Sequence, residues 1–491
     1  MAEDVPAGGL TLLEALRLTL ERDPNVAIEA TRVDAARGAL QLATGRFDPV
    51  VGSGVTQTQA DVPLSPTDSR ETRTLRSTVG YTRELRSGLS LEPELALLRS
   101  EDVTAGSGSV NEGTLTFRLR QPLLRGRGSA VVRAEELSAE RELAASGLDL
   151  RQTVSFRVLT VASQYWRVQA AARNLEVLRA SEASAREMLA TTRRLIEADQ
   201  VPAAEQVQLE ANLAAKESSS IGGERLLFGE RQGLGREIGL DPAEIRGLPL
   251  PSDPFPAVAP GEVPPDSRAG DFISVALRRR TDLEAARQRQ TGVDVQRRAF
   301  QNALQPQLDL IFAPAYSGLV AGSDPGSFFS PLYRNVPGAG ATVSFNLSWP
   351  TRNQRARGSL IQYESLQRRS ALAVDLLTKE IGADVPAALD AVARNAFQLA
   401  KARQAVSLFE RAVVNEEKKL RAGSSTLLDL INQRDRLTAA RQTEVSAELA
   451  LALSLLDLRF VTGTLLAEGG EAGALEPTRL TTLPSPGEEA R

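Results

Sequence analysis

Apolar residues recur every seven positions over two long stretches, one in each half of the chain. A seven-residue apolar repeat predicts helices that supercoil on neighbouring helices. No Pro interrupts residues 137–198, so this helix would have some 60 residues and a length of roughly 90 Å at 1.5 Å per residue. The stripes by themselves are ordinary coiled-coil seams, so function must come from their arrangement. The recurring positions are Val154, Val161, Val168 and Leu175 in the first half, and Val392, Leu399, Val406, Val413 and Leu420 after Pro386 in the second.

Each long helical pattern ends in a short break, after which a second helical pattern begins. The breaks are Ala-Asp-Gln-Val-Pro at 198–202 and Ala-Gly-Ser-Ser at 422–425. Gly, Pro, Ser and Asp are typical turn residues. The sequence therefore predicts two long helical hairpins, with tips near Asp199 and Gly423.

A different pattern, with a period of two, precedes each hairpin. In residues 341–349 apolar and polar residues alternate strictly, which predicts a strand. Residues 308–316 repeat the alternation, with a Gly/Pro/Ser-rich connection over 318–340, and residues 115–120 do the same in the first half. Such strands fit a membrane barrel wall with an apolar outside; the alternative is one half-buried face of a soluble antiparallel sheet. The candidate lipid-facing residues are Val343, Phe345, Leu347, Trp349, Leu115, Phe117 and Leu119.

The order of these patterns is duplicated. Leu20, Val26 and Pro49 lie 257 positions before Leu277, Leu283 and Pro306, and the second tip follows the first by 224 positions at both Asp199/Gly423 and Glu205/Asp429. A fixed separation of matching features indicates an internal repeat. The separation between matching residues falls from 257 positions before the strand regions to 224 positions after them, so the two repeats differ in the length of their strand regions.

These patterns predict five segments. Residues 1–9 are a flexible N-terminus, and 241–270 form an extended linker with eight prolines. The first repeat, 10–240, contains a helix, a strand region at about 47–124 and the hairpin with its tip near 199. The second repeat, 271–466, contains a helix, a strand hairpin at about 306–349 and the hairpin with its tip near 423. Residues 467–491, rich in Gly, Pro and charge, form a disordered tail.

The strand count predicts an oligomer. Each repeat offers at least one strand pair, and about four strands cannot close a barrel that needs around eight. Three copies would supply twelve strands, since identical chains usually assemble with closed symmetry. Twelve is a minimum, because residues 74–85 and 89–98 flank Arg86-Ser87-Gly88 and would form a further hairpin.

Composition excludes several function classes. The chain has no Cys and no His, which removes thiolate chemistry, His-based catalysis and the usual zinc ligands. A net charge of −4 argues against nucleic acid as a partner. No GxxxxGK[ST] loop and no run of 18 apolar residues is present, so neither nucleotide hydrolysis nor a transmembrane helix is expected. Met1-Ala2-Glu3-Asp4 is acidic without a following apolar segment, so an exported protein would have had its signal removed.

Five segments carry a resemblance to a known family over about residues 10–466. They are LTLLEALRLTLERDPNV and ALRRRTDLEAA at the openings of the repeats, QPLLRGRG after the first strand region, and the tips RLIEADQVPAAEQVQLEA and KLRAGSSTLLDLINQRD. In this order and duplicated, they resemble the TolC-like outer membrane factor (outer membrane efflux protein) family. The resemblance implies a mainly α fold with β: a homotrimer forming a long α-helical coiled-coil barrel and a membrane β-barrel, from two internal structural repeats.

The resemblance also implies roles for the tips, which in this family narrow the periplasmic mouth and meet an adaptor. The implied gate residues are Asp429, Glu205, Asn432 and Ser425; the last two depart from the family's usual acid and Arg. Three symmetric copies of Asp429 would form a carboxylate ring, which binds cations at a constriction. The ordinary alternative for both acids is the first turn of a helix, where the dipole favours them. Implied adaptor-docking residues are Leu195, Asp199, Val201, Gly423, Leu427 and Leu428.

The first hypothesis is therefore a passive outer membrane channel of a tripartite efflux pump or type I secretion system, with an iris-like periplasmic gate. It would have no enzymatic activity, cofactor or metal, and would lie in the cell outer membrane and extend into the periplasm. Its partners would be a periplasmic adaptor protein, an inner-membrane transporter and outer membrane lipid, without nucleic acid. The alternative is a soluble coiled-coil scaffold or adaptor that binds partner helices. A hydrolase with paired carboxylates lacks any convergence of acids, and the exported substrate is not predicted.

Overall fold

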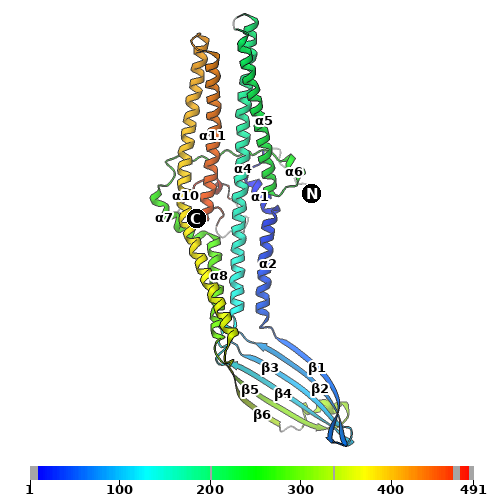
Figure 1. Ribbon diagram of the computed structural model, residues 1–491. Helices are drawn as coiled ribbons and strands as arrows, with labels where there is room; N and C mark the ends of the chain where they lie inside the picture. Colours follow the sequence, from blue (N-terminus) through cyan, green and yellow to red (C-terminus); the bar gives the residue numbers. More distant parts are fainter. Residues whose placement is uncertain (1–8, 200–201, 335–337, 468–475, 486–491) are drawn as a thin grey trace. The chain divides into compact units, whose positions relative to one another are not determined.

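The computed structural model describes residues 9–199, 202–334, 338–467 and 476–485 (Figure 1). Val201, residues 1–8 of the flexible N-terminus predicted for 1–9, and most of the predicted tail lie outside these ranges. The chain forms two compact units. The helical unit comprises the chain up to Val33, Ser146–Ala285 and Val374 onward; the sheet unit comprises Asp34–Ala145 and Ala286–Ala373. Within the described residues, no helix combines the length and the apolarity that crossing a membrane requires.

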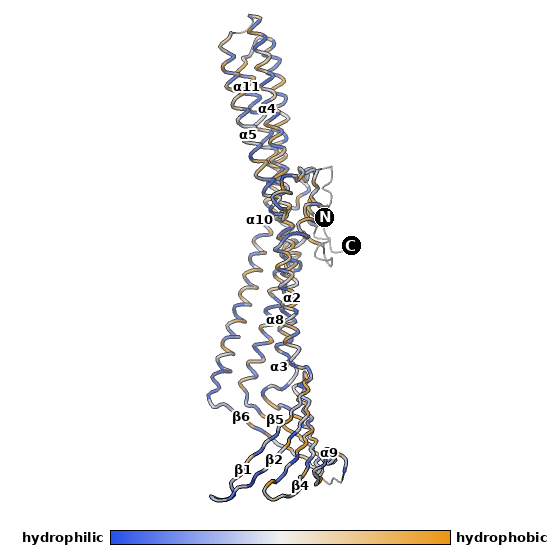
Figure 2. The backbone as a smooth tube through the Cα atoms, turned by 90° about the vertical axis from the view of Figure 1, so that its right-hand side faces the viewer, coloured by the Kyte–Doolittle hydropathy of each residue, from blue (hydrophilic) through white to orange (hydrophobic). Residues whose placement is uncertain are grey.

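The helical unit is built on two hairpins of long helices. The first consists of α4 (Ala134–Glu197) and α5 (Ala204–Ile238), the second of α10 (Gln354–Arg421) and α11 (Leu427–Val461); α4 and α10 begin in the sheet unit. Apolar and polar residues alternate along these helices in Figure 2. The predicted seven-residue stripes face inward: Val154, Val161, Val168 and Leu175 of α4 are buried, as are Val392, Leu399, Val406 and Val413 of α10.

Two apolar cores hold this unit together. The first surrounds Tyr165 and Trp166 of α4 and includes Leu16 of α1 (Leu12–Arg22). The second joins Leu389 of α10 and Leu451 of α11 to Phe272 of α7 (Ala269–Arg279). Burying large side chains of this kind contributes about 1.5–3 kcal/mol each.

Helix α10 differs from the expectation that its helical pattern follows Pro386, because the helix begins at Gln354 and passes through that residue. A Pro inside a helix removes one hydrogen bond and normally kinks or breaks it. Ile381, Val385 and Leu389 on either side of Pro386 are all buried in the second core. Tertiary packing thus keeps the helix continuous.

The Pro-rich linker passes over the first core. It starts with a short helix, α6 (Pro242–Gly247), capped by Asp241 and Glu244, and ends at η1 (Asp266–Arg268) and α7. Between them Pro251 pairs with Leu10 in an isolated bridge, and the Tyr165 hydroxyl donates to Leu10 O at 2.9 Å. Phe255 stacks on Trp166 with ring centroids 5.4 Å apart.

The predicted disordered tail needs a correction in its described part. Residues Pro477–Leu480 form the short helix η3, and the Leu480 side chain is buried in the first core. Arg459, itself buried, donates to Thr482 O at 2.7 Å and to Leu483 O at 3.0 Å. The disorder prediction rested on the average composition of the tail, which is rich in Gly, Pro and charged residues, and an average does not show the few residues that make contacts.

The sheet unit contains one six-stranded antiparallel sheet in sequence order (Figure 1). Four strands come from the first half of the chain, where the further hairpin around Arg86-Ser87-Gly88 is present as β2–β3. Other elements of this unit are α2 (Pro24–Gly45) and α8 (Thr281–Asn302), which both begin in the helical unit, and α3 (Ser129–Val132). The strands are β1 (Val50–Ser65), β2 (Asp68–Glu84), β3 (Ser90–Asp102), β4 (Ser107–Pro122), β5 (Gln307–Ala321) and β6 (Gly338–Ser348).

The strand register gives the sheet an apolar and a polar face. Residues directly opposite one another in an antiparallel pair share a face. One such row is Leu91, Leu119, Phe312 and Val343, and another, four residues further along each strand, is Val79, Leu95, Leu115 and Tyr316. A row on the other face is Gly52, Gly80, Glu94, Thr116, Ala315 and Gly340.

The candidate lipid-facing residues of β4 and β6 lie on the apolar face, while Trp349 follows the end of β6. Phe345 and Leu347 are 63% and 67% exposed. The connection expected over 318–340 is shorter and more ordered than predicted. Strand β5 continues to Ala321, and α9 (Pro325–Phe329) and η2 (Ser330–Leu332) follow because Asp324 caps α9 through the Ser327 amide.

Candidate functional site at the hairpin tips and the seam between the hairpins

The two hairpin turns use the same unusual backbone conformation at matching positions. Asp199 has φ 54° and Gly423 has φ 74°. Gly adopts this left-handed region freely, and Asp does so more readily than most residues. Because both turns need this backbone conformation, Asp199 and Gly423 occupy equivalent positions of the two repeats although their side chains differ.

Asp429 caps the helix that leaves the second tip. Its carboxylate accepts from the Thr426 hydroxyl at 2.6 Å and from the Thr426 amide at 3.2 Å, while the Thr426 hydroxyl accepts from the Asp429 amide. These hydrogen bonds lower the pKa of Asp429, so the exposed side chain is a carboxylate at neutral pH. The structure thus gives Asp429 the ordinary first-turn role and leaves its charge on the surface.

The other residues of the second tip are arranged around Glu416 of α10. The Ser425 hydroxyl donates to Glu416 Oε1, and Lys419 lies 3.0 Å from Glu416 Oε2. The hydrogen bond from Ser425 is the main reason why the pKa of Glu416 is lowered. Asn432 is exposed on α11, one turn beyond the cap. Ser425 therefore makes a polar link across the turn, within one hairpin.

The first tip is built differently. Glu205 lies in the first turn of α5 and is half-buried, but the N-cap residue is Ala203, which has no side-chain hydrogen bond. The acids at the two matching positions therefore have unequal roles: Asp429 closes a capping box, whereas Glu205 has only the helix dipole.

The candidate docking residues also separate into two groups. Leu195 and Leu428 are 37% and 48% exposed. Leu427, by contrast, packs against a small buried cluster of Leu189, Leu209 and Ile431, which joins α4, α5 and α11. The predicted tip surface is therefore smaller than expected, because Leu427 holds the two hairpins together.

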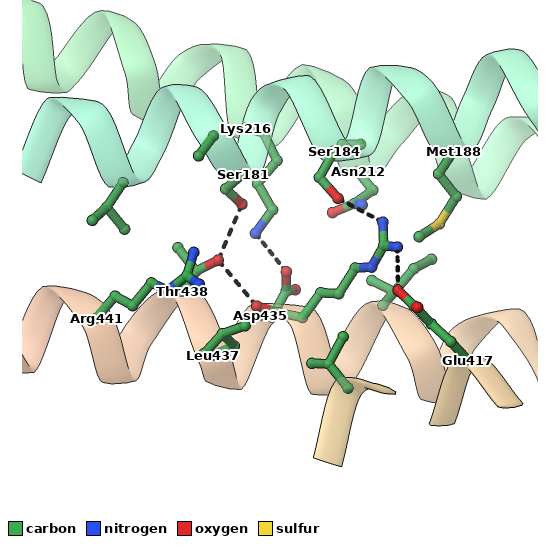
Figure 3. A pocket seen from close by; sticks show the side chains of 16 residues that line it. Ser181, Ser184, Met188, Asn212, Lys216, Glu417, Asp435, Leu437, Thr438 and Arg441 are labelled. Carbon is green, nitrogen blue, oxygen red and sulfur yellow. Dashed lines mark hydrogen bonds and ion pairs between the residues drawn. The ribbon is translucent and has the colours of Figure 1, made fainter. Parts of the chain in front are cut away.

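Farther from the tips than this cluster, polar side chains connect the two hairpins (Figure 3). Lys216 Nζ of α5 lies 2.6 Å from Asp435 Oδ1 of α11. Arg434 donates to Ser184 Oγ of α4 at 2.5 Å and to Glu417 Oε1 of α10 at 2.7 Å. We call the set Ser181, Ser184, Lys216, Glu417, Arg434, Asp435 and Thr438 the polar seam.

The polar seam continues along α11 at intervals of four residues. Thr438 donates to Ser181 Oγ at 3.2 Å, and Gln442 donates to Asn174 Oδ1 at 3.0 Å. Residues four apart lie on one face of a helix, so Arg434, Thr438 and Gln442 present one polar stripe to α4. The seam borders a cavity of about 240 Å³ whose charged lining residues Lys216, Glu417, Arg434, Asp435 and Arg441 each have an ionic partner.

Sequence reasoning missed the polar seam. One signal was present: Lys216 is the only Lys before position 379. Its partner lies on the other hairpin, more than 200 positions away, and one sequence gives no means of finding it. Within the described ranges no three potential metal ligands cluster.

The fold of the chain, with its two long helical hairpins and one antiparallel sheet, is that of solved outer-membrane channels. The chain has the fold of the Campylobacter jejuni CmeC outer membrane channel, with a TM-score of 0.65 at 13% identity, covering 96% of this chain and 92% of that one. It is equally similar to the outer membrane protein VceC from Vibrio cholerae, with a TM-score of 0.64 at 16% identity over 92% and 96% of the two chains. The Neisseria gonorrhoeae MtrE outer membrane channel in its open state gives 0.61 at 15% identity over 92% and 88%.

A sequence comparison gives a second, partial likeness. Residues 272–464 match the family described as outer membrane efflux protein. No curated protein matches the chain in sequence. The expected resemblance is thus confirmed: residues 272–464 match the outer membrane efflux protein family, and the fold is similar to solved outer-membrane channels over nearly the full length.

Proposed function

We propose that the protein is a passive outer membrane channel, the exit duct of a tripartite efflux pump or type I secretion system. The observation that carries the proposal is the likeness to outer-membrane channels over more than nine-tenths of the chain, together with the efflux family domain at 272–464. The channel would supply a route through the outer membrane, and the energy for transport would come from an inner-membrane partner.

The working form would be a homotrimer in which the sheets close a β-barrel in the outer membrane and the long helices form an α-helical barrel in the periplasm. The exposed apolar face of the sheet supports this arrangement, because lipid would cover Val343, Phe345 and Leu347. The opposite face, with Gly, Thr, Ser and charged residues, would line a polar lumen. Closed symmetry of identical copies is the usual form of such assemblies.

The hairpin tips would form the periplasmic gate and the docking site for an adaptor protein. Asp429 supports the gate, because its lowered pKa keeps it ionised and its side chain is exposed. Three copies around a symmetry axis would form a ring of carboxylates that binds cations. Leu195 and Leu428, the exposed apolar residues beside the turns, would contact the adaptor.

The test is the conductance of the detergent-purified protein in planar bilayers, with Asp429→Ala and the matched control Glu205→Ala, across a range of divalent cation concentrations. We expect stable pores that divalent cations block, with weaker block in Asp429→Ala and little change in Glu205→Ala. Unchanged block in both variants would leave the duct but remove the carboxylate gate. Well-folded protein that never inserts would overturn the proposal and favour the soluble scaffold.

A further inference from the structure

The sheet has two edge strands that lack a partner on one side. Among the described residues, β1 pairs only with β2, and β6 pairs only with β5. Both edges are long, since β1 has 16 residues and β6 has 11. A row of unpaired backbone amides and carbonyls is a template for another strand, and costs several kcal/mol per group in lipid.

Over most of their length, the two edge strands lack the residue types that usually protect a free sheet edge. Proteins usually blunt an exposed edge strand with charged residues or Pro. Residues 50–60 of β1 and the whole of β6 contain neither. The one charge and the one Pro of β1, Asp61 and Pro63, lie near its end at the β1–β2 turn. Most charged residues of the sheet lie on the inner strands, among them Arg76 of β2, Glu94 of β3 and Arg120 of β4. The edges are therefore suited to pairing rather than to exposure.

The direction of the strands allows the two edges to pair with each other between copies. All neighbouring strands are antiparallel, and the sheet has six of them, so β1 and β6 run in opposite directions. Placing β1 of one copy beside β6 of another continues the antiparallel pattern. An even number of antiparallel strands is also what membrane barrels of bacterial type contain.

The two faces of the sheet also continue across such a junction. On β6 the apolar face carries Val343, Phe345 and Leu347; on β1 the same face carries Val51 and Val55. The other face carries Gly52, Gly54 and Thr56 on β1, with Val50 and Val62 nearer its two ends, and Ser344 and Asn346 on β6. A shift of register by one residue would bring the apolar face of β6 beside the face of β1 that carries Gly52 and Gly54, so continuity of the faces favours pairings in which Val51 and Val55 share the face of Phe345.

We propose that β1 of each copy pairs with β6 of the next, so that three copies close a wall of eighteen strands, six from each. The proposal rests on the trimeric channel proposed above and specifies its membrane wall. The β1–β2 hairpin is then part of the barrel rather than an appendage outside it. Barrel diameter grows roughly linearly with strand number, so this wall is about half as wide again as the twelve-stranded minimum.

The pairing of β2 with β3 supports this role for the hairpin. It extends from Thr72↔Asp102 to Glu84↔Ser90, and the β1–β2 pairing runs from Val50↔Thr82 to Ser65↔Asp68. Strand β3 already has a neighbour on each side, β2 and β4, and so offers no free edge to β6 of another copy. A twelve-stranded wall would require the β2–β3 ladder to open.

Disulfide cross-linking tests the junction directly, because the chain has no Cys and every introduced thiol is unique. Phe345→Cys is combined in turn with Val51→Cys, Ser53→Cys, Val55→Cys and Gln57→Cys on the apolar face of β1, and with Gly54→Cys and Thr56→Cys on the other face. The full-length protein is oxidised in outer membranes and its covalent oligomers are separated in denaturing gels. We expect cross-linked dimers and trimers for at least one apolar-face pair and their loss for the opposite-face pairs.

Two controls keep the outcomes distinct. Phe312→Cys with Val343→Cys, which are opposite one another within one sheet, should form a link inside one chain and so report a folded sheet. Leu95→Cys on β3 with Phe345→Cys should form no covalent oligomer; an oligomer there would overturn the eighteen-stranded wall in favour of the twelve-stranded one. Conducting trimers in which no β1 position links to Phe345→Cys would overturn this inference alone, whereas a folded sheet without any trimer or conductance would overturn it together with the proposed function.

Discussion

The helical unit buries large apolar side chains in two cores within one chain, whereas the sheet unit leaves much of its apolar face exposed. Trp166 and Leu389 are almost fully buried among residues of the same chain, whereas Val343, Phe345 and Leu347 on the sheet face solvent in a single copy. Apolar burial is the main favourable contribution to folding. The helical unit therefore derives its stability within one chain, and the sheet unit depends on whatever covers its apolar face.

The backbone hydrogen bonds of the two units differ in the same way. A helix satisfies its amides and carbonyls along its own length, so α4 and α10 need no partner for their hydrogen bonds. The sheet satisfies its backbone between strands and leaves one side of β1 and of β6 open. The difference teaches that assembly and membrane insertion should alter the sheet unit more than the helical unit.

The largest expected effect is on the core of the helical unit. Trp166→Ala should lower the free energy of unfolding by about 3–5 kcal/mol, because it empties a cavity at the centre of the first core. Thermal unfolding of the detergent-solubilised protein, followed by circular dichroism, measures this. The matched control is Phe397→Ala, an aromatic residue exposed on α10 of the same unit, which should change stability by less than about 1 kcal/mol. Equal effects would break the comparison, since the core would then contribute no more than the surface.

The helical hairpins could be predicted well from the sequence, and particular residues show why. The seven-residue stripes at Val154–Leu175 and Val392–Val413 are local patterns, and both are buried in the structure. The turn positions Asp199 and Gly423 were marked by breaks in that pattern, and both have left-handed backbone conformations. A pattern that repeats within one helix can be recognised in a single sequence because it does not depend on residues distant in the chain.

The parts that could not be predicted depend on residues distant in sequence. The pairing of Lys216 with Asp435 and the packing of Leu427 against Leu189 join separate hairpins, and no local pattern encodes them. Strand β1 escaped a specific assignment because its Gly, Thr and Gln residues give a weak alternation. The order in the tail rests on Leu480 and on the contacts that Arg459 makes there, which composition could not reveal.

The next effect concerns an ionic cluster that stabilises the sheet unit within one chain. Glu136 is buried and accepts from Arg86 Nη2 at 2.7 Å and from Arg133 Nε at 2.8 Å. Glu136→Gln should destabilise this unit by about 2 kcal/mol, because two guanidinium groups lose their carboxylate partner. Hydrogen exchange of the peptides around β2, β3 and α3 measures the loss. The control Glu135→Gln, its exposed neighbour, should leave exchange unchanged.

The same cluster gives the sheet unit a pH dependence. The hydrogen bond from Arg86 lowers the pKa of Glu136 to about 2, from a usual value of 4.5. A carboxyl whose pKa is lowered by folding contributes stability that is complete above its unfolded pKa and is lost as the pH falls through the folded pKa. Stability of this unit should therefore decline from about pH 4.5 towards pH 2, and Glu136→Gln should flatten that decline. An unchanged slope in the variant would remove Glu136 as its cause.

A smaller effect is expected in the polar seam, where the helical unit departs from a purely apolar interior. Lys216→Met and Asp435→Asn each break an ion pair between α5 and α11, and a double-mutant cycle should give a coupling of about 1 kcal/mol or less, since Asp435 is partly exposed. The pair Arg179–Glu224, exposed on the surface of the first hairpin, is the matched control and should couple more weakly. Coupling of zero between Lys216 and Asp435 would show that the hairpins are joined by Leu427 and its apolar neighbours alone.

The smallest effect separates the two tips, which occupy equivalent places in the repeats but are capped differently. Thr426→Ala and Asp429→Asn each remove part of the capping box, so hydrogen exchange in the first turn of α11 should accelerate by about fivefold, the usual effect of losing an N-cap residue. Glu205→Gln at the first tip should change exchange in α5 far less, because no side-chain cap is present there. Folding lowers the pKa of Asp429, so the stability that its carboxylate contributes is complete above the usual Asp pKa and is lost as the pH falls through the lowered value. Hydrogen exchange at the second tip should therefore accelerate in acid. Asp429→Asn should abolish that pH dependence. Equal acid sensitivity at both tips would mean that the capping box does not distinguish them, and the asymmetry between the hairpins would then have to come from Leu427 and the polar seam.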